Sequence, residues 1–244
     1  MVVEALCAGE PAMGLTFAAL AAGRKVVTAN KANVAEAWQR LRPYMRGDES
    51  ALRFSAAVGG AVPVLEIIEK LRASSNVVRV RAVLNGTCNF VLERMHEGAT
   101  YSHAVDEARA QGFAEADPHL DVSGLDAASK LVLISLKAFG EVPTTLERQG
   151  IDRLSPAAVE ATRPSTSVIK LVATVSLQDG RVVARVAPEL LTSDDYLAGA
   201  RFEHNRFDVT LETGETVHLS GRGAGRWPTA TSVMGDVWSV ARER

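Results

Sequence analysis

Residues 25–45, KVVTANKANVAEAWQRLRPYM, join a short apolar run to a helical pattern, and this junction decides the fold class. The first five residues predict a buried strand, and residues 34–45 predict a helix. Residues 1–6 predict an earlier strand, residues 11–22 a helix that begins at a proline, and residues 52–58 a third strand. Strands and helices that alternate at this spacing indicate an α/β fold with a parallel sheet.

A different pattern begins after the glycine pair at residues 59–60. Residues 63–73 predict an amphipathic helix, and VVRVRAVL (77–84) alternates like a half-exposed strand of a second sheet. Further helices are predicted over residues 89–98, 102–112, 123 to about 139 and 232–244, and strands over residues 167–177, 181–191, 207–214 and 216–221, with Asp-Gly and Thr-Gly turns. The second part of the chain is therefore expected to be an α+β unit.

The composition excludes several classes of protein. The 244 residues are 47% hydrophobic and 23% charged, as in a globular protein with a substantial core. A net charge of −2 argues against a nucleic-acid platform or a membrane-surface binder. Cys7 and Cys88 show no spacing typical of a disulfide framework or a zinc site. No apolar run reaches the length of a membrane span, and the first residues lack the basic region of a signal peptide. We expect a soluble cytoplasmic protein with a small-molecule partner.

The stretch GFAEADPHLDVSGLDAASK (112–130) places four carboxylates before one lysine. Ser123 followed by Asp126 resembles a capping box, which predicts the start of a helix. Asp126 and Lys130 then lie one turn apart on one face of a largely apolar helix, which favours burial. The spacing does not match a calcium loop. These residues alone leave four interpretations open: a solvated loop, a helical salt bridge, a site for a substrate ammonium, and acid–base chemistry by the lysine.

Three shorter segments are also candidate sites. Lys31 follows a buried strand at its carboxyl end, where open α/β sheets bind ligands, although a surface lysine at a helix start is the simpler interpretation. NGT (85–87) predicts a tight turn where backbone and hydroxyl groups meet a ligand. GRGAGRWPTA (221–230) predicts a glycine-rich turn before the last helix, which either lets the backbone approach a phosphate or ring or is a plain flexible turn.

Taken together, these segments resemble the homoserine dehydrogenase family. The resemblance rests on GRKVVTANKANVA (23–35), SAAVGGAVPVLE (55–66), VLNGTCNFVL (83–92), GFAEADPHLDVSGLDAASK (112–130) and GRGAGRWPTATSV (221–233). These motifs occur in the family's order and spacing across nearly all of the chain, and the acidic motif that ends in lysine is the most specific of them.

The resemblance implies a partial Rossmann-type nucleotide-binding domain and an α+β catalytic and dimerisation domain with a mixed or antiparallel sheet. Residues 1–55 would be the remnant of the first domain, with residues 221–244 packing back on it, and residues 56–220 would form the second. The implied activity is the NAD- or NADP-dependent interconversion of L-aspartate 4-semialdehyde and L-homoserine, in threonine and methionine biosynthesis. The family also implies a homodimer that forms through the second sheet.

The family's functional residues carry over to positions in this sequence. The implied catalytic residues are Lys130 and Lys31. Lys130 matches the proton donor to the carbonyl oxygen, and Lys31 matches a lysine that lines the cofactor and substrate cleft. The implied substrate-binding residues are Glu115, Asp121, Asp126, Gly86 and Thr87, and the implied cofactor-binding residues are Lys31, Gly112 and Gly225.

Two positions depart from the family. The family binds a monovalent cation through backbone carbonyls, here those of Val58, Gly60 and Val62, and one acidic side chain. Ser55 stands at the acidic position, so we expect a weakened or absent cation site. The family's first strand and G-x-G-x-x-G turn have no counterpart in these residues, so we expect poor cofactor binding by them alone. The alternative is a non-catalytic relative, an amino-acid-binding or subunit-interaction module that has lost the cofactor.

Overall fold

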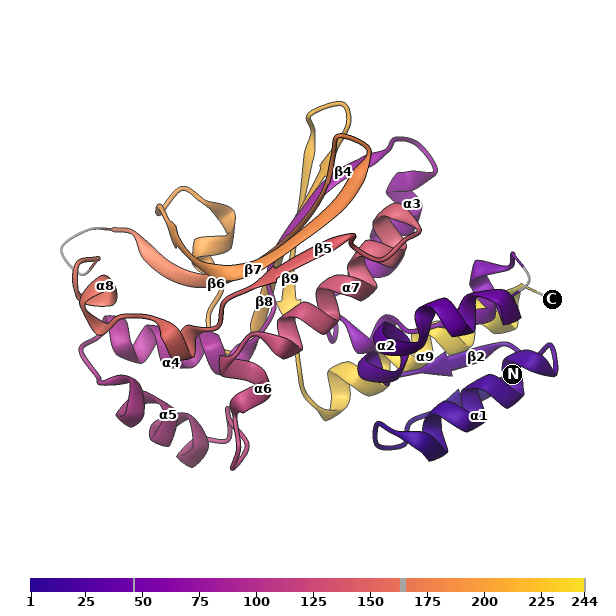
Figure 1. Cartoon of the computed structure of the whole chain (residues 1–244), viewed down its shortest axis with the longest axis horizontal. Helices are drawn as coiled ribbons and strands as arrows, with labels where there is room; N and C mark the ends of the chain where they lie inside the picture. The colour runs from indigo at the N-terminus through magenta and orange to yellow at the C-terminus, as the bar shows by residue number, and fades with distance from the viewer. Residues whose placement is uncertain (46, 163–165, 244) are drawn as a thin grey trace.

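The computed structural model describes residues 1–45, 47–162 and 166–243. A small sheet with its helices occupies one end of the molecule, and a larger, strongly twisted sheet with its own helices occupies the other (Figure 1). The predicted combination of a parallel sheet and a second, mixed sheet is confirmed. No helix of the described ranges is long and apolar enough to cross a membrane.

The small sheet is parallel, in the order β1 (Val2–Glu4), β2 (Val26–Thr28) and β3 (Leu52–Arg53). Helices α1 (Glu10–Ala21) and α2 (Lys31–Leu41) connect the strands. The predicted third strand over residues 52–58 is wrong beyond Arg53, because a 3-10 turn, η3 (Ser55–Ala57), follows. The Ser55 N–H is bonded to a side chain, so it cannot continue the ladder.

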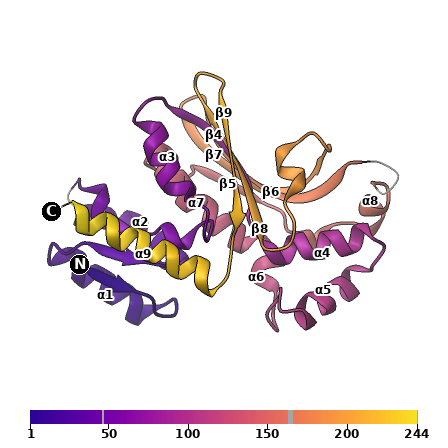
Figure 2. The ribbon, with the colours of Figure 1, turned by 180° about the vertical axis from the view of Figure 1, so that it is seen from behind.

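The C-terminal helix α9 (Arg226–Arg242) lies along the small sheet, where it contacts β2 and η3 (Figure 2). It is longer than the sequence predicts. Residues 226–230, assigned above to a glycine-rich turn, form its first turns, because Gly225 ends the turn at φ 125° and the first turn of a helix tolerates Pro228.

The large sheet has the order β5-β7-β6-β4-β8-β9, in which only the β5–β7 pair is parallel. Its strands are β4 (Val77–Val83), β5 (Thr145–Arg148), β6 (Val168–Gln178), β7 (Arg181–Leu191), β8 (His204–Leu211) and β9 (Thr216–Arg222). Asp179 and Gly180 both have positive φ in the β6–β7 turn, which is the geometry that a two-residue hairpin needs.

Helices cover one face of the large sheet. Helices α4 (Gly86–His96) and α7 (Leu125–Phe139) pack directly on its strands, and α3 (Val64–Arg72) packs on α7. Leu131 and Leu133 of α7 and Phe207 of β8 are completely buried there. The shorter elements are α5 (Tyr101–Ala110), α6 (His119–Val122), α8 (Pro156–Glu160) and the 3-10 turns η1 (Arg42–Met45), η2 (Glu49–Ala51), η4 (Ile151–Arg153) and η5 (Tyr196–Gly199).

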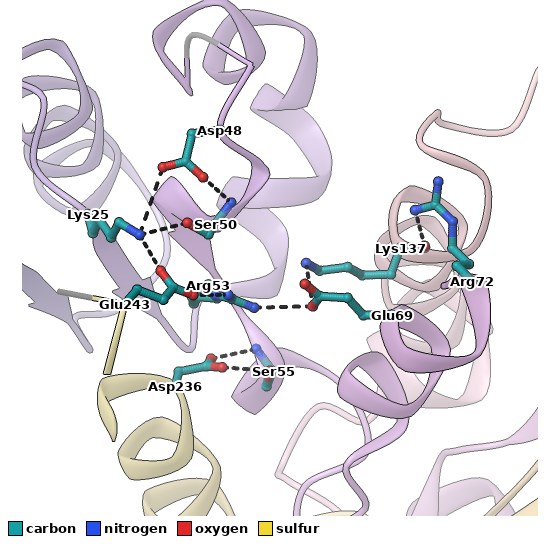
Figure 3. Close-up of polar contacts among 10 residues, drawn as sticks. All are labelled: Lys25, Asp48, Ser50, Arg53, Ser55, Glu69, Arg72, Lys137, Asp236 and Glu243. Atoms are coloured by element: carbon teal, nitrogen blue, oxygen red, sulfur yellow. Dashed lines mark hydrogen bonds and ion pairs between the residues drawn. The ribbon is translucent and has the colours of Figure 1, made fainter. Parts of the chain in front are cut away.

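A chain of ion pairs joins the two ends of the molecule (Figure 3). Arg53 of β3 donates to Glu69 of α3 at 3.1 Å and to Glu243 after α9 at 2.6 Å. The Glu69 carboxylate also lies 3.5 Å from the Lys137 ammonium of α7. The helix that carries Lys130 is therefore tied through Glu69 to the edge of the small sheet.

A buried carboxylate makes the second connection, between α9 and η3. Asp236 of α9 is 2% exposed, and its two oxygens accept hydrogen bonds from the N–H and the hydroxyl of Ser55 at 2.9 and 2.8 Å (Figure 3). Burial raises the pKa of Asp236, and the two hydrogen bonds oppose that rise. The pair fixes where α9 meets η3.

We expect Asp236→Ala to lower the free energy of unfolding by about 1–3 kcal/mol, since it strands two buried donors of Ser55. Urea titration measures the change. Asp236→Asn, which keeps one acceptor oxygen, should cost less, and Asp194→Ala at an exposed site should stay within about 0.5 kcal/mol of the parent. An Asp236→Ala variant as stable as the parent contradicts the assigned role.

Candidate active site

A cavity of about 670 Å³ lies at the carboxyl ends of β1 and β2, where it separates the small sheet from α6 and α7. The loops after the two strands form one wall, and the acidic stretch forms the other. The carboxyl edge of a parallel sheet is the usual binding edge of such folds. Its lining residues are Leu6, Ala8, Ala29, Asn30, Lys31, Ala32, Glu36, Glu115, Asp117, Leu120, Asp121, Leu125, Asp126 and Ser129.

Asp126 is the centre of the polar contacts at this cavity. Its side chain is 11% exposed, and its two oxygens bind two different lysines: Oδ1 lies 3.2 Å from Lys31 Nζ, and Oδ2 lies 2.8 Å from Lys130 Nζ. Burial alone would raise the pKa of Asp126, but the ammonium groups of Lys130 and Lys31 lower it to about 2. The carboxylate is therefore ionised at any physiological pH.

Lys130 is held in a fixed position. Besides Asp126, its Nζ donates to the Leu84 carbonyl at 3.0 Å, and its side chain is only 13% exposed. Asp126 and Lys130 lie one turn apart on α7, as the sequence predicts. The predicted capping box is wrong, because Gly124, with φ 79°, is the N-cap and the Ser123 hydroxyl is buried without a hydrogen-bond partner in the described part of the chain.

Asn85 connects the carboxylate of Asp121 to that of Asp126. Its side-chain N–H groups donate to Asp121 Oδ1 at 2.7 Å and to Asp126 Oδ2 at 3.0 Å, while its oxygen accepts the Cys88 N–H at the start of α4. The Thr87 hydroxyl lies 2.9 Å from the other oxygen of Asp121. Asn85 is the N-cap of α4, and Gly86 and Thr87 form its first turn, so the predicted tight turn at NGT is wrong. The segment positions the acidic pair, and its contact with a ligand stays a prediction.

Comparison with known proteins points to one family. The sequence model described as homoserine dehydrogenase matches residues 63–238. The chain belongs to the homoserine dehydrogenase family. The homoserine dehydrogenase of Mycobacterium tuberculosis (strain H37Rv) is 36% identical over 252 aligned positions, which cover 100% of this chain and 57% of that protein. The NAD(+)-dependent homoserine dehydrogenase of Pseudomonas canavaninivorans is 34% identical, over 94% of this chain and 66% of that protein.

Solved structures of the family have the same fold. The putative homoserine dehydrogenase from Archaeoglobus fulgidus superposes with a TM-score of 0.88 at 31% identity, over 98% of this chain and 74% of that one. A hyperthermophilic archaeal homoserine dehydrogenase in complex with NADPH gives 0.86 at 27% identity, over 99% and 72%. This chain thus spans little more than half the length of the curated relative from M. tuberculosis.

The structure brings some of the family's implied residues together and leaves others apart. Glu115 is exposed and lines the cavity with Lys31. Gly86 is not among the lining residues, since it packs against the backbone of residues 202–203, where a Cβ would lie 3.2 Å from the Phe202 carbonyl oxygen. Gly112, after α5, and Gly225, at the start of α9, also lie outside the lining.

The sequence singles out the NGT segment, but the residues assigned a role were Gly86 and Thr87 and not Asn85, whose amide lies between both carboxylates. The available signal was its place directly before a helix, since asparagine is a favoured N-cap. A second residue missed was Glu4, 3% exposed at the end of β1, which accepts the Leu6 N–H at 2.7 Å and the Thr28 hydroxyl at 2.5 Å. Its contacts shape the two loops that line the cavity.

The segment that matches the family's cation site makes close contacts within the chain. The Val62 carbonyl accepts a backbone N–H at 2.8 Å, and a Cβ on Gly60 would lie 2.6 Å from the Gly223 backbone. Ser55 bonds the carboxylate of Asp236. Within residues 1–45, 47–162 and 166–243 no three His, Cys, Asp or Glu side chains could hold a metal. The weakened or absent cation site stays a prediction. No reaction step is assigned to a cation.

The pKa of Asp126 gives a pH prediction. Because its pKa falls from the ordinary 3.8 to about 2 on folding, its ionised form contributes about 2 kcal/mol of stability above pH 3.8, and this is lost as the pH falls through about 2. The difference in unfolding free energy between the parent and Asp126→Asn should therefore shrink in that window. Asp106→Asn, at an exposed site, is the control. Parallel curves for the parent and Asp126→Asn would contradict the assignment.

The role of Asn85 is tested by a pair of variants. Asn85→Asp keeps the cap oxygen but places a third carboxylate beside Asp121 and Asp126, so it should destabilise the fold more at about pH 7 than at about pH 4. Asn85→Ala loses the cap and should cost about 1 kcal/mol, with a weaker pH dependence. Urea titrations at both pH values measure the effect. An equal loss for Asn85→Asp at both would exclude the carboxylate contact as its cause.

Proposed function

We propose that this chain provides the substrate site and proton donor of a homoserine dehydrogenase, which interconverts L-aspartate 4-semialdehyde and L-homoserine with NAD or NADP. One observation carries the proposal: the Asp126 carboxylate, at the binding edge of the small sheet, holds the ammonium groups of Lys31 and Lys130 at 3.2 and 2.8 Å. The threonine and methionine pathways are the proposed metabolic setting.

Lys130 suits the role of general acid. Reduction of the aldehyde leaves a developing negative charge on its oxygen, and a proton must reach that atom. The Lys130 ammonium has three N–H groups, of which Asp126 and the Leu84 carbonyl take two. The third has no partner among the described residues and would donate to the substrate oxygen in a direction that the two fixed contacts set. Lys130 is not itself a lining residue of the cavity, but its ammonium lies 2.8 Å from the lining residue Asp126. Asp126 thus acts on the lysine as an orienting partner.

The cavity also suits the substrate's ammonium group. Five of its lining residues are carboxylates, Glu36, Glu115, Asp117, Asp121 and Asp126, against the single lining cation Lys31. Both oxygens of Asp121 lie within hydrogen-bond distance of Asn85 and Thr87, which makes Asp121 a positioning group. Glu115 is exposed at the wall, so its carboxylate is the proposed contact for the substrate ammonium.

The residues present fit the reactive end of the cofactor. NAD or NADP supplies the hydride when bound. The loops after β1 and β2, including Ala8 and Ala29, and the side chain of Lys31 line the cavity where a nicotinamide ring would face the substrate. A second cavity of about 550 Å³ lies beside it, at the start of α1 and along α2. The implied roles of Gly112 and Gly225 in cofactor binding stay predictions.

Two further properties are proposed with the function. A homodimer would form on the face of the large sheet where Thr174, Arg185 and Glu189 line a cavity of about 350 Å³. A reducing compartment, the cytoplasm, suits Cys7 and Cys88, which are both free thiols. The alternative of a non-catalytic module draws no support from the relatives, which are named as homoserine dehydrogenases.

Lys130→Met, placed in a polypeptide with a complete cofactor domain, should lower kcat by about 100-fold or more because it removes the proton donor. The assay follows oxidation of NADPH or NADH by L-aspartate 4-semialdehyde. L-Homoserine binding, measured by calorimetry, should change far less, since the carboxylates make the ammonium contact. Lys70→Met, at an exposed position of α3, is the matched control. Turnover of Lys130→Met within threefold of the parent would exclude the role.

A further inference from the structure

A separate cavity, of about 230 Å³, lies at the other end of α4 from the substrate site and shares no lining residue with it. It is enclosed by α4, α8, β6 and the segment around η5. Its lining residues are Leu92, Glu93, His96, Glu97, Val159, Val168, Ile169, Lys170, Ala198 and Arg201. The proposed dehydrogenase chemistry makes no use of them.

Lys170 is an unusual residue to find in a cavity wall. It is 5% exposed, and its ammonium donates to the Ala200 carbonyl at 2.6 Å, which leaves two of its three N–H groups for another partner. Burial, with help from the nearby guanidinium groups of Arg201 and Arg206, lowers the pKa of Lys170 to about 8, and the Glu93 carboxylate opposes this. A buried lysine of this kind needs a counter-charge.

Glu93 faces the same space with an unused acceptor. Its Oε1 accepts a hydrogen bond from Arg201 at 2.5 Å, but its Oε2 is buried and has no hydrogen-bond partner among the described residues. Lys170 and Glu93 line one cavity and interact electrostatically, yet no ion pair within 4.0 Å joins them in the described part of the chain. A gap therefore separates a buried ammonium from a buried carboxylate oxygen.

We propose that this cavity binds an α-amino acid with a compact aliphatic side chain. The ligand's carboxylate would accept hydrogen bonds from Lys170, and its ammonium would donate to Oε2 of Glu93, which satisfies both buried groups. Its side chain would contact the apolar walls formed by Leu92, Val159, Val168, Ile169 and Ala198. The volume is below the ~300 Å³ at which drug-sized pockets begin, which suits a ligand of this size.

The probe is L-valine, titrated calorimetrically into the whole chain. We expect one bound molecule, and binding at least about tenfold weaker for N-acetyl-L-valine, which has no ammonium, and for L-valinamide, which has no carboxylate. Glu93→Gln and Lys170→Met should each weaken L-valine binding by about tenfold or more. Asp126→Asn, in the substrate cavity, should leave it unchanged.

Circular dichroism separates loss of binding from loss of fold. If Lys170→Met unfolds, Glu93→Gln, which keeps shape and volume, still decides the question, and methyl NMR shifts of Val159, Val168 and Ile169 locate the ligand in the parent. The proposal is overturned if L-valine does not bind at millimolar concentrations, which would mean that ordered water fills the gap. It is equally overturned if Asp126→Asn abolishes binding while Glu93→Gln does not.

Discussion

The Asp126 carboxylate is the contact on which the active-site geometry depends. A buried charge is costly unless it is paired, and here the pairing comes from two separate parts of the chain, Lys31 at the start of α2 and Lys130 one turn along α7. The two lysines can reach one carboxylate only if the carboxyl end of β2 lies against the start of α7. The cavity between the small sheet and the acidic stretch follows from that arrangement.

Contacts outside the cavity support the same arrangement of the small sheet and α7. Glu69 links Arg53 at the edge of the small sheet to Lys137, two turns further along α7 than Lys130. Asp236 fixes α9 to η3 through Ser55, and Glu243 adds Arg53 to the same cluster. These groups are not close to the cavity, but they hold the helix and the sheet that carry its two walls.

The sequence predicts what depends on neighbours close along the chain. The α/β order, the hairpin at Asp179–Gly180, the helix over residues 125–139 and the one-turn spacing of Asp126 and Lys130 all follow from local periodicity and turn chemistry. The resemblance to the homoserine dehydrogenase family pointed to four residues that line the cavity: Lys31, Glu115, Asp121 and Asp126. It also pointed to Lys130, which is not a lining residue but lies 2.8 Å from Asp126. It could not show that Asp121 is hydrogen-bonded to Asn85 and Thr87, whereas Glu115 is exposed.

Two errors in the sequence predictions arise where a residue distant in the sequence binds a polar group that the local pattern assigns elsewhere. The strand predicted through residue 58 ends early because Asp236, 181 positions away, binds the Ser55 N–H. The capping box fails because Gly124 adopts a left-handed conformation and takes the N-cap position from Ser123. Asn85 was overlooked because its two carboxylate partners lie 36 and 41 residues further on. For Ser55 and Asn85 the deciding contact is set by tertiary packing, which a pattern of neighbouring residues does not encode.

The most direct test of this account is a crystal structure of the chain with L-homoserine bound. The ligand should lie in the cavity between the small sheet and α7, with its ammonium within hydrogen-bond distance of Glu115 and its hydroxyl oxygen within reach of Lys130 Nζ. Asp126 should keep both lysines in the bound state. A ligand bound elsewhere, or a Lys130 that leaves Asp126 and points away from the hydroxyl, would contradict the assignment of this cavity as the substrate site.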